Sequence, residues 1–428
     1  MGLNILHTAD WHLGAKLYNA SREEEHQRFL SWLLDHIRAE EIDLLLVAGD
    51  IFHYTQPSAE ATALYYHFLA RAAAETDLRQ IVVVGGNHDS ASRLDAPSEV
   101  LKVLNVHVVG GLSADQDTWE RCLCPVRGSS GEVEAVVVAV PFVHEFRLGV
   151  RTTGMEPGEA RAAIQEAFTR LYSDLADRAE ARWPGVPLLT TGHMTCKGAP
   201  VAGYNTPIHL SAMIGGQPAD VIFDRRYSYV ALGHIHLLHN CEDSTAWYCG
   251  SPLPLNVLEA RTPRYILRVA LDADDPRGAA TPTPIEVPVE RQLIELRGGQ
   301  DEIVAQLEAI EPRGDLEPYV WVDVEVDHYT PEVSSPLIEA LARRAQEDGG
   351  VRPRLIRVGQ SIRAAEAIEL GAGEDVGPTL RDLDPEEVFV RLYRTRNNDN
   401  PPRDAVLETF REIKHRVEIE RDERKARS

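Results

Sequence analysis

Short, continuous apolar runs alternate with amphipathic segments over roughly the first 270 residues. The runs include residues 3–8, 44–48, 81–84, 136–140, 188–191 and 229–232. Runs of this kind are typical of strands that are covered on both faces of a sheet. Residues 23–40 and 58–75 have helical periodicity, and Pro57-Ser58 is a helix start signal. The alternation predicts an α/β domain over residues 1–270.

A second, smaller unit follows residues 272–288, a stretch rich in Asp, Pro, Gly and Thr that predicts a linker. Alternating patterns predict strands at 293–296, 319–326 and 354–358, and helices at 301–309 and 336–347. We therefore expect an α+β domain over residues 285–370. A Gly-rich break at 371–378 precedes a charged tail, residues 379–428, in which one helical face is apolar (Val406, Leu407, Phe410, Ile413 and Val417).

Composition sets further limits. The 428 residues have room for two or three domains, and the five cysteines lack Cys-x-x-Cys spacing, which predicts reduced thiols in a cytoplasmic protein. No stretch approaches the roughly 18 apolar residues of a membrane helix, so no membrane association is expected. The net charge of −23 argues on its face against a nucleic-acid partner, although phosphate contacts need only a local basic strip. Candidates for that strip are Arg93, Lys102, Lys197, Arg225 and Arg226.

Five polar clusters stand where predicted strands end. They are Asp10-Trp11-His12, Gly49-Asp50-Ile51-Phe52-His53, Gly85-Gly86-Asn87-His88-Asp89, Gly192-His193 and Gly233-His234-Ile235-His236. In four of the five, glycine directly precedes the polar group, which permits a sharp turn and close backbone approach. Ligand sites of open α/β sheets form at those carboxyl ends of strands. We therefore expect the clusters to share one site.

The residue types in these clusters predict metal binding. Asp, Asn and His together suit Mn²⁺, Fe²⁺ or Zn²⁺. The set is too large for one ion but would fill two sites if one carboxylate bridged: Asp10, His12, Asp50, Asn87, His193, His234 and His236. Two ions roughly 3.5–4 Å apart can clamp the attacking and leaving oxygens of a phosphoryl displacement. His88, which is not needed as a ligand, is free to protonate the leaving oxygen.

These motifs resemble those of calcineurin-like metallophosphoesterases, and in detail those of the SbcD nucleases, bacterial relatives of the nuclease in eukaryotic double-strand-break repair complexes. The likeness is carried by residues 10–14, by residues 49–53 with Pro57-Ser58 behind them, and by residues 250–255. Where phosphoprotein phosphatases have a carboxylate and Asp-Arg-Gly, this chain has His53-Tyr54-Thr55. The resemblance is close over roughly the first 260 residues. It implies two packed mixed sheets flanked by helices, with residues 285–370 as a capping domain.

The resemblance also implies roles for single residues. One metal would be held by Asp10, His12, Asp50 and His236, and the other by Asp50, Asn87, His193 and His234, with Asp50 as the bridge. His88 would be the catalytic histidine, supported by His53. Partner-binding residues would lie in the tail, among them Phe389, Leu392, Tyr393, Phe410 and Ile413.

The implied activity is Mn²⁺-dependent cleavage of DNA: 3′-to-5′ exonuclease action on double-stranded ends and endonuclease action on single strands and hairpins. Its context would be double-strand-break repair and recombination, as a homodimer with an SbcC-type coiled-coil ATPase. The segment Asn256-Val257-Leu258-Glu259 departs from the family, which usually has an aromatic or acidic residue before Glu. We expect that departure to affect the contact between nuclease and cap but not the metal centre. The stretch 194–200 also departs, which predicts a differently shaped loop beside His193.

Alternatives follow from the same residues. A phosphodiesterase or phosphatase for small nucleotides or phosphoproteins would use the same centre and would suit the acidic surface better. A protein whose metals only stabilise the fold is a third interpretation, which the intact ligand set with His88 disfavours. The helix predicted at 58–75, with Leu64, Tyr65, Phe68 and Leu69, is either a homodimer face or a core-facing helix.

Overall fold

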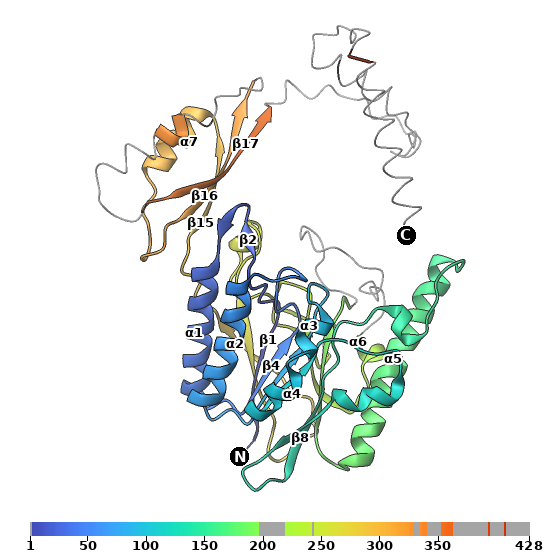
Figure 1. Cartoon of the computed structure of the whole chain (residues 1–428). Coiled ribbons are helices and arrows are strands. Elements are labelled where there is room, and N and C mark those ends of the chain that lie inside the picture. The colour runs from blue at the N-terminus through green and yellow to red at the C-terminus, as the bar shows by residue number, and fades with distance from the viewer. Residues whose placement is uncertain are drawn as a thin grey trace. The chain divides into compact units, whose positions relative to one another are not determined.

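The structure, a computed structural model, describes residues 2–196, 219–241, 244–327, 334, 336–339, 352–362, 393 and 406–407. Its core is two six-stranded sheets (Figure 1). The first sheet has the order β14-β13-β1-β4-β5-β6, with bounds β1 Asn4–Thr8, β4 Leu44–Ala48, β5 Gln80–Val84, β6 Val106–Val109, β13 Tyr265–Ala270 and β14 Thr283–Glu286. The strands β1, β4, β5 and β6 are parallel, β13 pairs antiparallel with β1, and β14 pairs antiparallel with β13.

The second sheet has the order β11-β12-β10-β9-β8-β7. Its bounds are β7 Leu123–Arg127, β8 Val133–Val138, β9 Leu188–His193, β10 Tyr227–Gly233, β11 His239–Asn240 and β12 Ala246–Tyr248. The central strands are parallel, and β7 and β11 add antiparallel edges. The expected mixed two-sheet α/β architecture is thus confirmed. All five cysteines are free and buried.

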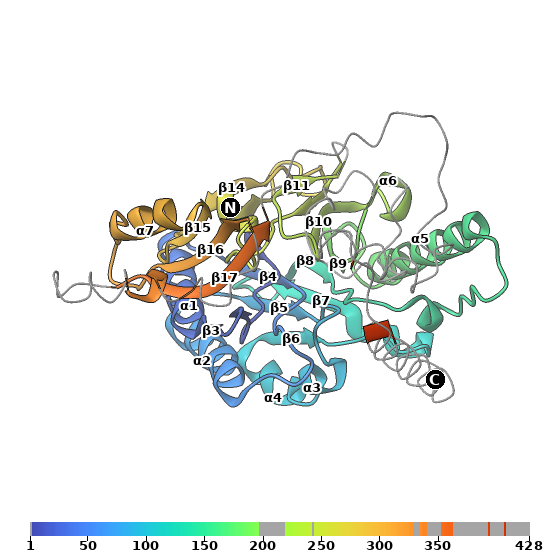
Figure 2. The same ribbon diagram turned by 90° about the horizontal axis from the view of Figure 1, so that it is seen from above.

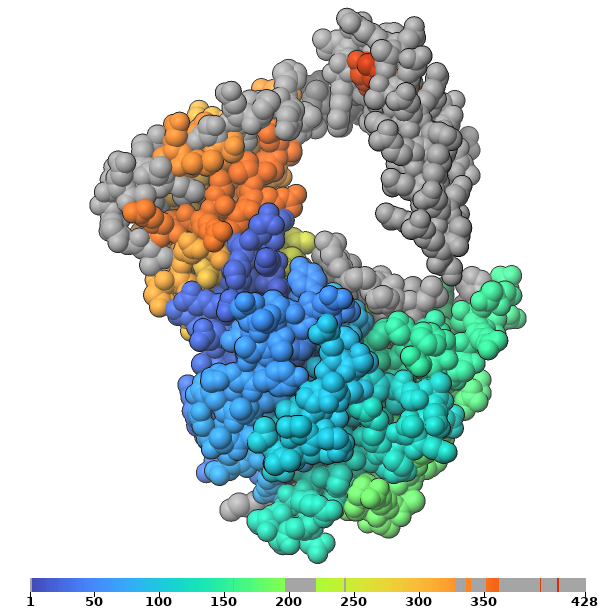
Figure 3. Space-filling view, viewed as in Figure 1, coloured from blue at the N-terminus to red at the C-terminus, as the bar shows by residue number. Residues whose placement is uncertain are grey.

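Helices cover the outer faces of both sheets (Figures 1 and 2). On the first sheet lie α1 (Glu23–Ala39), α2 (Ala59–Glu75), α3 (Ala91–Asp95) and α4 (Ser98–Leu101). The side chains of α2 to α4, blue to cyan in Figure 3, form one continuous surface. The second sheet packs on α5 (Pro157–Arg182), which the apolar pattern did not predict because its charged residues interrupt the periodicity.

Alternate residues of the central strands face opposite layers, which is why the strands read as continuous apolar runs. In β4, Leu45 and Val47 pack with α1 and α2, whereas Leu44 and Leu46 pack with the second sheet. The Ser58 hydroxyl caps α2 by accepting from Ala61 N at 3.2 Å, as the start signal predicted.

The apolar side of α2 faces the core of its own domain. Tyr65, Phe68 and Leu69 are buried there, and Leu64 packs partly against the same cluster. These side chains are therefore not available as a homodimer face, and the core-facing interpretation of this helix is the one that the structure supports.

The smaller domain, which the resemblance predicts to be a cap, has a three-stranded parallel sheet, β15-β16-β17, with α7 against it. Its elements are β15 Leu293–Gly298, α7 Gln300–Glu308, β16 Tyr319–Val326 and β17 Arg354–Ile362. The prediction of a linker over 272–288 was wrong for residues 283–286, because they form β14 on the first sheet. A short hairpin, β2 (Lys16–Leu17) and β3 (Ala20–Ser21), contacts the cap: the Tyr319 hydroxyl donates to Ser21 O at 2.7 Å.

Candidate metal centre

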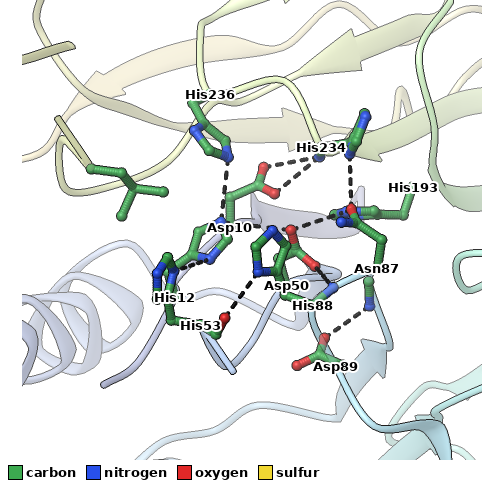
Figure 4. Close-up of polar contacts among 12 residues, drawn as sticks. Asp10, His12, Asp50, His53, Asn87, His88, Asp89, His193, His234 and His236 are labelled. Atoms are coloured by element: carbon green, nitrogen blue, oxygen red, sulfur yellow. Dashed lines mark hydrogen bonds and ion pairs between the residues drawn. The ribbon is translucent and has the colours of Figure 1, made fainter. Parts of the chain in front are cut away.

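The predicted polar clusters converge at the carboxyl ends of strands from both sheets (Figure 4). From the first sheet, Asp10 and His12 follow β1, Asp50 follows β4, and Asn87 and His88 follow β5. From the second, His193 ends β9, and His234 and His236 follow β10. Asp10, His12, Asp50, His193 and His234 are at most 1% exposed. The seven predicted ligands thus gather in one place, five of them buried and Asn87 and His236 half-buried.

The loops that carry these side chains are held in unusual conformations. Among the described residues, seven other than glycine have positive φ, and four of the seven are predicted ligands: Asp10, His12, Asp50 and His234. Such conformations persist only where surrounding contacts over-determine them. Here the first two loops are paired, because Asp10 N donates to Gly49 O at 2.9 Å and His12 N donates to Asp50 O at 3.0 Å.

Two glycines are required by this close approach. A Cβ at Gly86 would lie 2.1 Å from Asp50 Oδ1, and one at Gly49 would lie 2.2 Å from His193 Nδ1. Gly49 also has φ +92°, which side chains rarely tolerate. The glycines noted in the sequence thus serve close packing between neighbouring loops.

One group of donors gathers on the His236 side of Asp10. Ligand atoms of Asp10, His12 and His236 lie within 4.8 Å of one another. The Nε2 atoms of His12 and His236 are 3.3 Å apart, and His12 Nε2 is 3.5 Å from Asp50 Oδ2. This is the set that the resemblance assigns to one metal.

A second group gathers on the His193 side. Asp10, Asp50 and His193 form another set within 4.8 Å, and His193 Nε2 is 3.3 Å from Asp50 Oδ2. The Asn87 Oδ1 atom lies 3.1 Å from His193 Nε2 and 2.9 Å from His234 Nδ1. Because His193 Nδ1 donates to Ala48 O at 2.9 Å, Nε2 is the nitrogen that faces the centre.

Burial and the charges of neighbouring side chains shift the pKa values of these groups. Burial raises the pKa of Asp10 to about 6, against the opposing effect of His193. Burial also acts to raise the pKa of Asp50, but His193 and His12 outweigh it and hold that pKa well below its usual range. For His193, burial opposes the charged form, yet Asp50 dominates and raises the pKa to about 9. Without metal, Asp50 and His193 thus form a buried ion pair.

This donor set fits a pair of divalent cations. Two buried carboxylates face imidazole nitrogens and an amide oxygen, and positive charge must compensate such carboxylates. A cation would replace the proton that His193 holds, because ligand atoms must be deprotonated to bind metal. Asp50 Oδ2 faces both His12 Nε2, at 3.5 Å, and His193 Nε2, at 3.3 Å. When bound, two such ions polarise phosphoryl oxygens and lower the pKa of coordinated water.

His88 and His53 lie at the edge of this centre. His88 Nδ1 donates to His53 O at 2.9 Å, and His88 N donates to Asp50 Oδ1 at 2.9 Å. The two rings stack with centroids 5.5 Å apart. Burial, and then His88, lowers the pKa of His53 to about 4, so His53 is neutral at physiological pH. Because His88 Nδ1 carries the hydrogen donated to His53 O, Nε2 is the nitrogen through which His88 would transfer a proton.

Two carboxylates to which the sequence analysis assigned no role support the predicted ligands. Asp89 accepts from Gly86 N at 2.8 Å, Ile51 N at 3.0 Å and Phe52 N at 2.9 Å, which ties the Asp50 loop to the Asn87 loop. Glu259 lies 3.2 Å from His236 Nδ1. Glu259 thus contacts a predicted ligand from within the segment 256–259, and the expectation that the atypical residues before it leave the metal centre unaffected stays a prediction.

Comparison with known proteins gives the family. The model of the calcineurin-like phosphoesterases matches residues 3–238, and that of the type 5 capsule protein repressor C-terminal domain matches residues 289–397. The chain belongs to the calcineurin-like phosphoesterase family. This phosphoesterase is 36% identical to the SbcD component of the nuclease SbcCD from Rhodobacter capsulatus, over 79% of this chain and 84% of the relative. It is 30% identical to the Escherichia coli K12 protein of that name, over 96% of this chain and 98% of the relative.

The predicted resemblance to the SbcD nucleases is confirmed by these relatives, and the family implies divalent metals. Several other predictions about this phosphoesterase concern residues that the structure does not describe. Phe389, Leu392, Phe410, Ile413 and Lys197 lie outside the described residues, as does most of the loop after His193. Tyr393 is helical and half-buried. No helix within the described ranges is long and apolar enough to cross a membrane.

The proposed basic strip is partly neutralised. Arg226 pairs with Asp224 and Asp177, both at 2.7 Å, and Lys102 pairs with Glu99 at 2.5 Å. Cationic side chains engaged in this way within the protein have less charge to offer to phosphates. Arg226 and Lys102 are accordingly weaker candidates than the sequence indicated.

Proposed function

We propose that this protein is a two-metal DNA nuclease that acts with an SbcC-type coiled-coil ATPase. The observation that carries the proposal is the convergence of seven side chains from both sheets in one place, with His88 beside Asp50. The name shared by the relatives supports nucleic acid as the substrate.

In this proposal Asp10, His12, Asp50 and His236 hold one metal, and Asp50, Asn87, His193 and His234 hold the other, with Mn²⁺ as the ion. Mn²⁺ accepts the mixed oxygen and nitrogen set that these residues present. The bridging role is supported by Asp50 Oδ2, which lies 3.5 Å from His12 Nε2 and 3.3 Å from His193 Nε2, and by the low pKa that keeps Asp50 ionised.

His88 delivers a proton to the leaving oxygen of the cleaved phosphodiester. Its Nδ1–H is fixed by His53 O, so the ring presents Nε2 in a defined orientation. His53 supports this ring by stacking on it and by remaining neutral, which avoids a second positive charge beside His88. General acid catalysis of this type contributes typically about 10²- to 10⁴-fold.

The finer activity that we propose is 3′-to-5′ exonuclease action on duplex ends and endonuclease action on single strands and hairpins, in double-strand-break repair and recombination. The cap, residues 285–370, would place DNA over the metals. The tail would bind the ATPase, and the protein would work as a cytoplasmic homodimer that associates with the nucleoid when bound to DNA.

The test is cleavage of end-labelled duplex and hairpin DNA by the purified protein with Mn²⁺. We expect cleavage that is lost on chelation and falls at least about 100-fold in His88→Ala, with two Mn²⁺ ions still bound. His107→Ala is the matched control, because that histidine lies on β6 and contacts Arg121 O instead of the centre. Cleavage that persists unchanged in His88→Ala would contradict the proposal.

A second candidate is a phosphodiesterase for small nucleotides, which the net charge of −23 favours. Relative turnover separates the two functions. A small phosphodiester that is hydrolysed far faster than DNA would favour this candidate. High Mn²⁺ content with every phosphoester left uncut would instead favour a structural role for the metals.

A further inference from the structure

A buried carboxylate lies directly behind one predicted metal ligand. Glu259 is 1% exposed and begins the short 3-10 helix η5 (Glu259–Arg261). Its Oε1 is 3.2 Å from His236 Nδ1 and accepts from Asn256 Nδ2 at 2.7 Å, while its Oε2 accepts from Leu255 N at 2.9 Å. Both oxygens of Glu259 are thus fixed by named donors, and the imidazole of His236 is one of them.

The contact with Glu259 determines which nitrogen of the His236 ring carries the hydrogen. A carboxylate accepts only, so His236 Nδ1 carries the hydrogen, and in the neutral ring Nε2 keeps its lone pair. Nε2 is the atom that faces His12 and belongs to the group with Asp10. Glu259 therefore selects the tautomer that can bind a cation.

The backbone of His236 is held by the same segment. Arg264, 2% exposed, donates from Nη1 to His236 O at 2.8 Å, and that nitrogen is 3.6 Å from Glu259 Oε2. Glu259 N also donates to Asn256 Oδ1 at 3.0 Å, so the carboxylate has little freedom to turn away. The ring of His236 is thus held by Glu259 and its main chain by Arg264, neither of which is a predicted ligand.

We infer that Glu259 is a positioning residue for the metal centre: it fixes the tautomer and ring plane of His236 and so strengthens binding of the cation that His236 shares with Asp10 and His12. The inference rests on the proposed two-metal centre. A carboxylate that accepts from the far nitrogen of a metal-binding imidazole orients the ring and raises its basicity, and its loss typically weakens metal binding by roughly 10- to 100-fold.

The test compares Glu259→Gln with Glu295→Gln in the full chain. Glu295 is a matched control, because it pairs with Arg261 of the same short helix and does not contact His236. Isothermal titration with Mn²⁺ alone should show two sites in the parent protein. In Glu259→Gln we expect one site weakened roughly 10- to 100-fold and the other within about twofold. Glu295→Gln should retain both affinities.

A merely structural Glu259 gives a different result. Glu259→Gln would then unfold at a lower urea concentration while both Mn²⁺ affinities stayed at parent values, which overturns the inference. Because the Gln variant is at risk of not folding, Glu259→Asp keeps the charge and provides a second test. Its shorter side chain should weaken the same single site by an intermediate factor, and unchanged affinity would again contradict the inference.

The outcomes separate this inference from the proposed function. If the parent protein binds two Mn²⁺ ions but leaves DNA intact, the nuclease proposal fails while the role of Glu259 is still decided by the titration. If the parent cleaves DNA and Glu259→Gln binds Mn²⁺ normally, the nuclease proposal stands and the positioning role is excluded.

Discussion

The imidazole Nδ1 of His193 donates to the carbonyl oxygen of Ala48 at 2.9 Å, which joins the end of β9 in the second sheet to the end of β4 in the first. Ala48 directly precedes Gly49 and Asp50, so the contact places a ligand from each sheet next to the other. Stability of the sandwich and assembly of the metal centre should therefore change together.

Metal removal is the most direct check of that coupling. Chelation by EDTA should lower the melting temperature, and added Mn²⁺ should restore it in a concentration-dependent way. A ligand at 100 times its Kd stabilises the folded state by about 2.7 kcal/mol per site. Thermal scans with and without Mn²⁺ measure the effect, and Ca²⁺, which prefers oxygen ligands, should restore less. An EDTA-insensitive melting temperature would argue against a built metal site.

Gly86→Ala should abolish Mn²⁺ binding, because the added Cβ would lie 2.1 Å from Asp50 Oδ1 and 2.3 Å from Asp50 N. The backbone atom cannot move without displacing Asp50, the proposed bridging ligand. Gly158→Ala is the matched control: it lies in α5, where a Cβ meets nothing within 4 Å. That variant should keep metal binding and gain up to about 1 kcal/mol of stability. Titration calorimetry and urea unfolding measure both changes.

Asp89→Asn should weaken both the fold and the centre. The amide cannot accept from all three backbone donors that Asp89 satisfies, at Gly86, Ile51 and Phe52. The loss should be about 2 kcal/mol of unfolding free energy, together with weaker Mn²⁺ binding. The control Asp115→Asn changes an exposed carboxylate that accepts from Asp117 N far from the centre. Equal effects of the two variants would show that the loop tie is unimportant.

Glu25→Gln should disrupt the joint between the phosphoesterase domain and the smaller domain that follows it. Glu25 bridges two buried arginines, with Arg22 Nη2 at 2.6 Å and Arg291 Nε at 2.8 Å. Loss of the carboxylate leaves both guanidinium groups buried without their charged partner, which costs about 3–5 kcal/mol. Asp315→Asn is the control, since its pairing with Arg28 also joins α1 to the cap segment but on the surface. It should change the urea midpoint little, because water screens that pair.

His26→Leu should flatten the acid dependence of stability. Burial lowers the pKa of His26 to about 3, so the fold favours the neutral ring, whereas the unfolded chain takes up the proton near pH 6.5. Stability from this group is fully present above pH 6.5 and is lost as pH falls from there towards 3. Between pH 7 and pH 5 the loss is about 2 kcal/mol. Urea unfolding at both pH values should show a correspondingly smaller decrease in the variant.

The strands, and the meeting of polar residues at their carboxyl ends, could be predicted from residue patterns alone. Continuous apolar runs such as residues 44–48 are typical of strands covered on both faces, and polar residues at their carboxyl ends were expected to share an edge. Local signals also located the start of α2 at Ser58. These features depend on residues close in the chain, which is why periodicity and turn chemistry suffice.

The groups that support the ligands became apparent only from the packing of separate elements. Glu259 lies 23 residues beyond His236 in the chain, yet contacts its ring, and β14 joins the first sheet from within a stretch that resembles a linker. The apolar residues of α2 are compatible with either a core-facing helix or a subunit interface. Only the packing of Phe68 and Leu69 into the core decides between the two. Contacts of this kind depend on how distant segments meet in three dimensions, and local residue patterns do not encode that information.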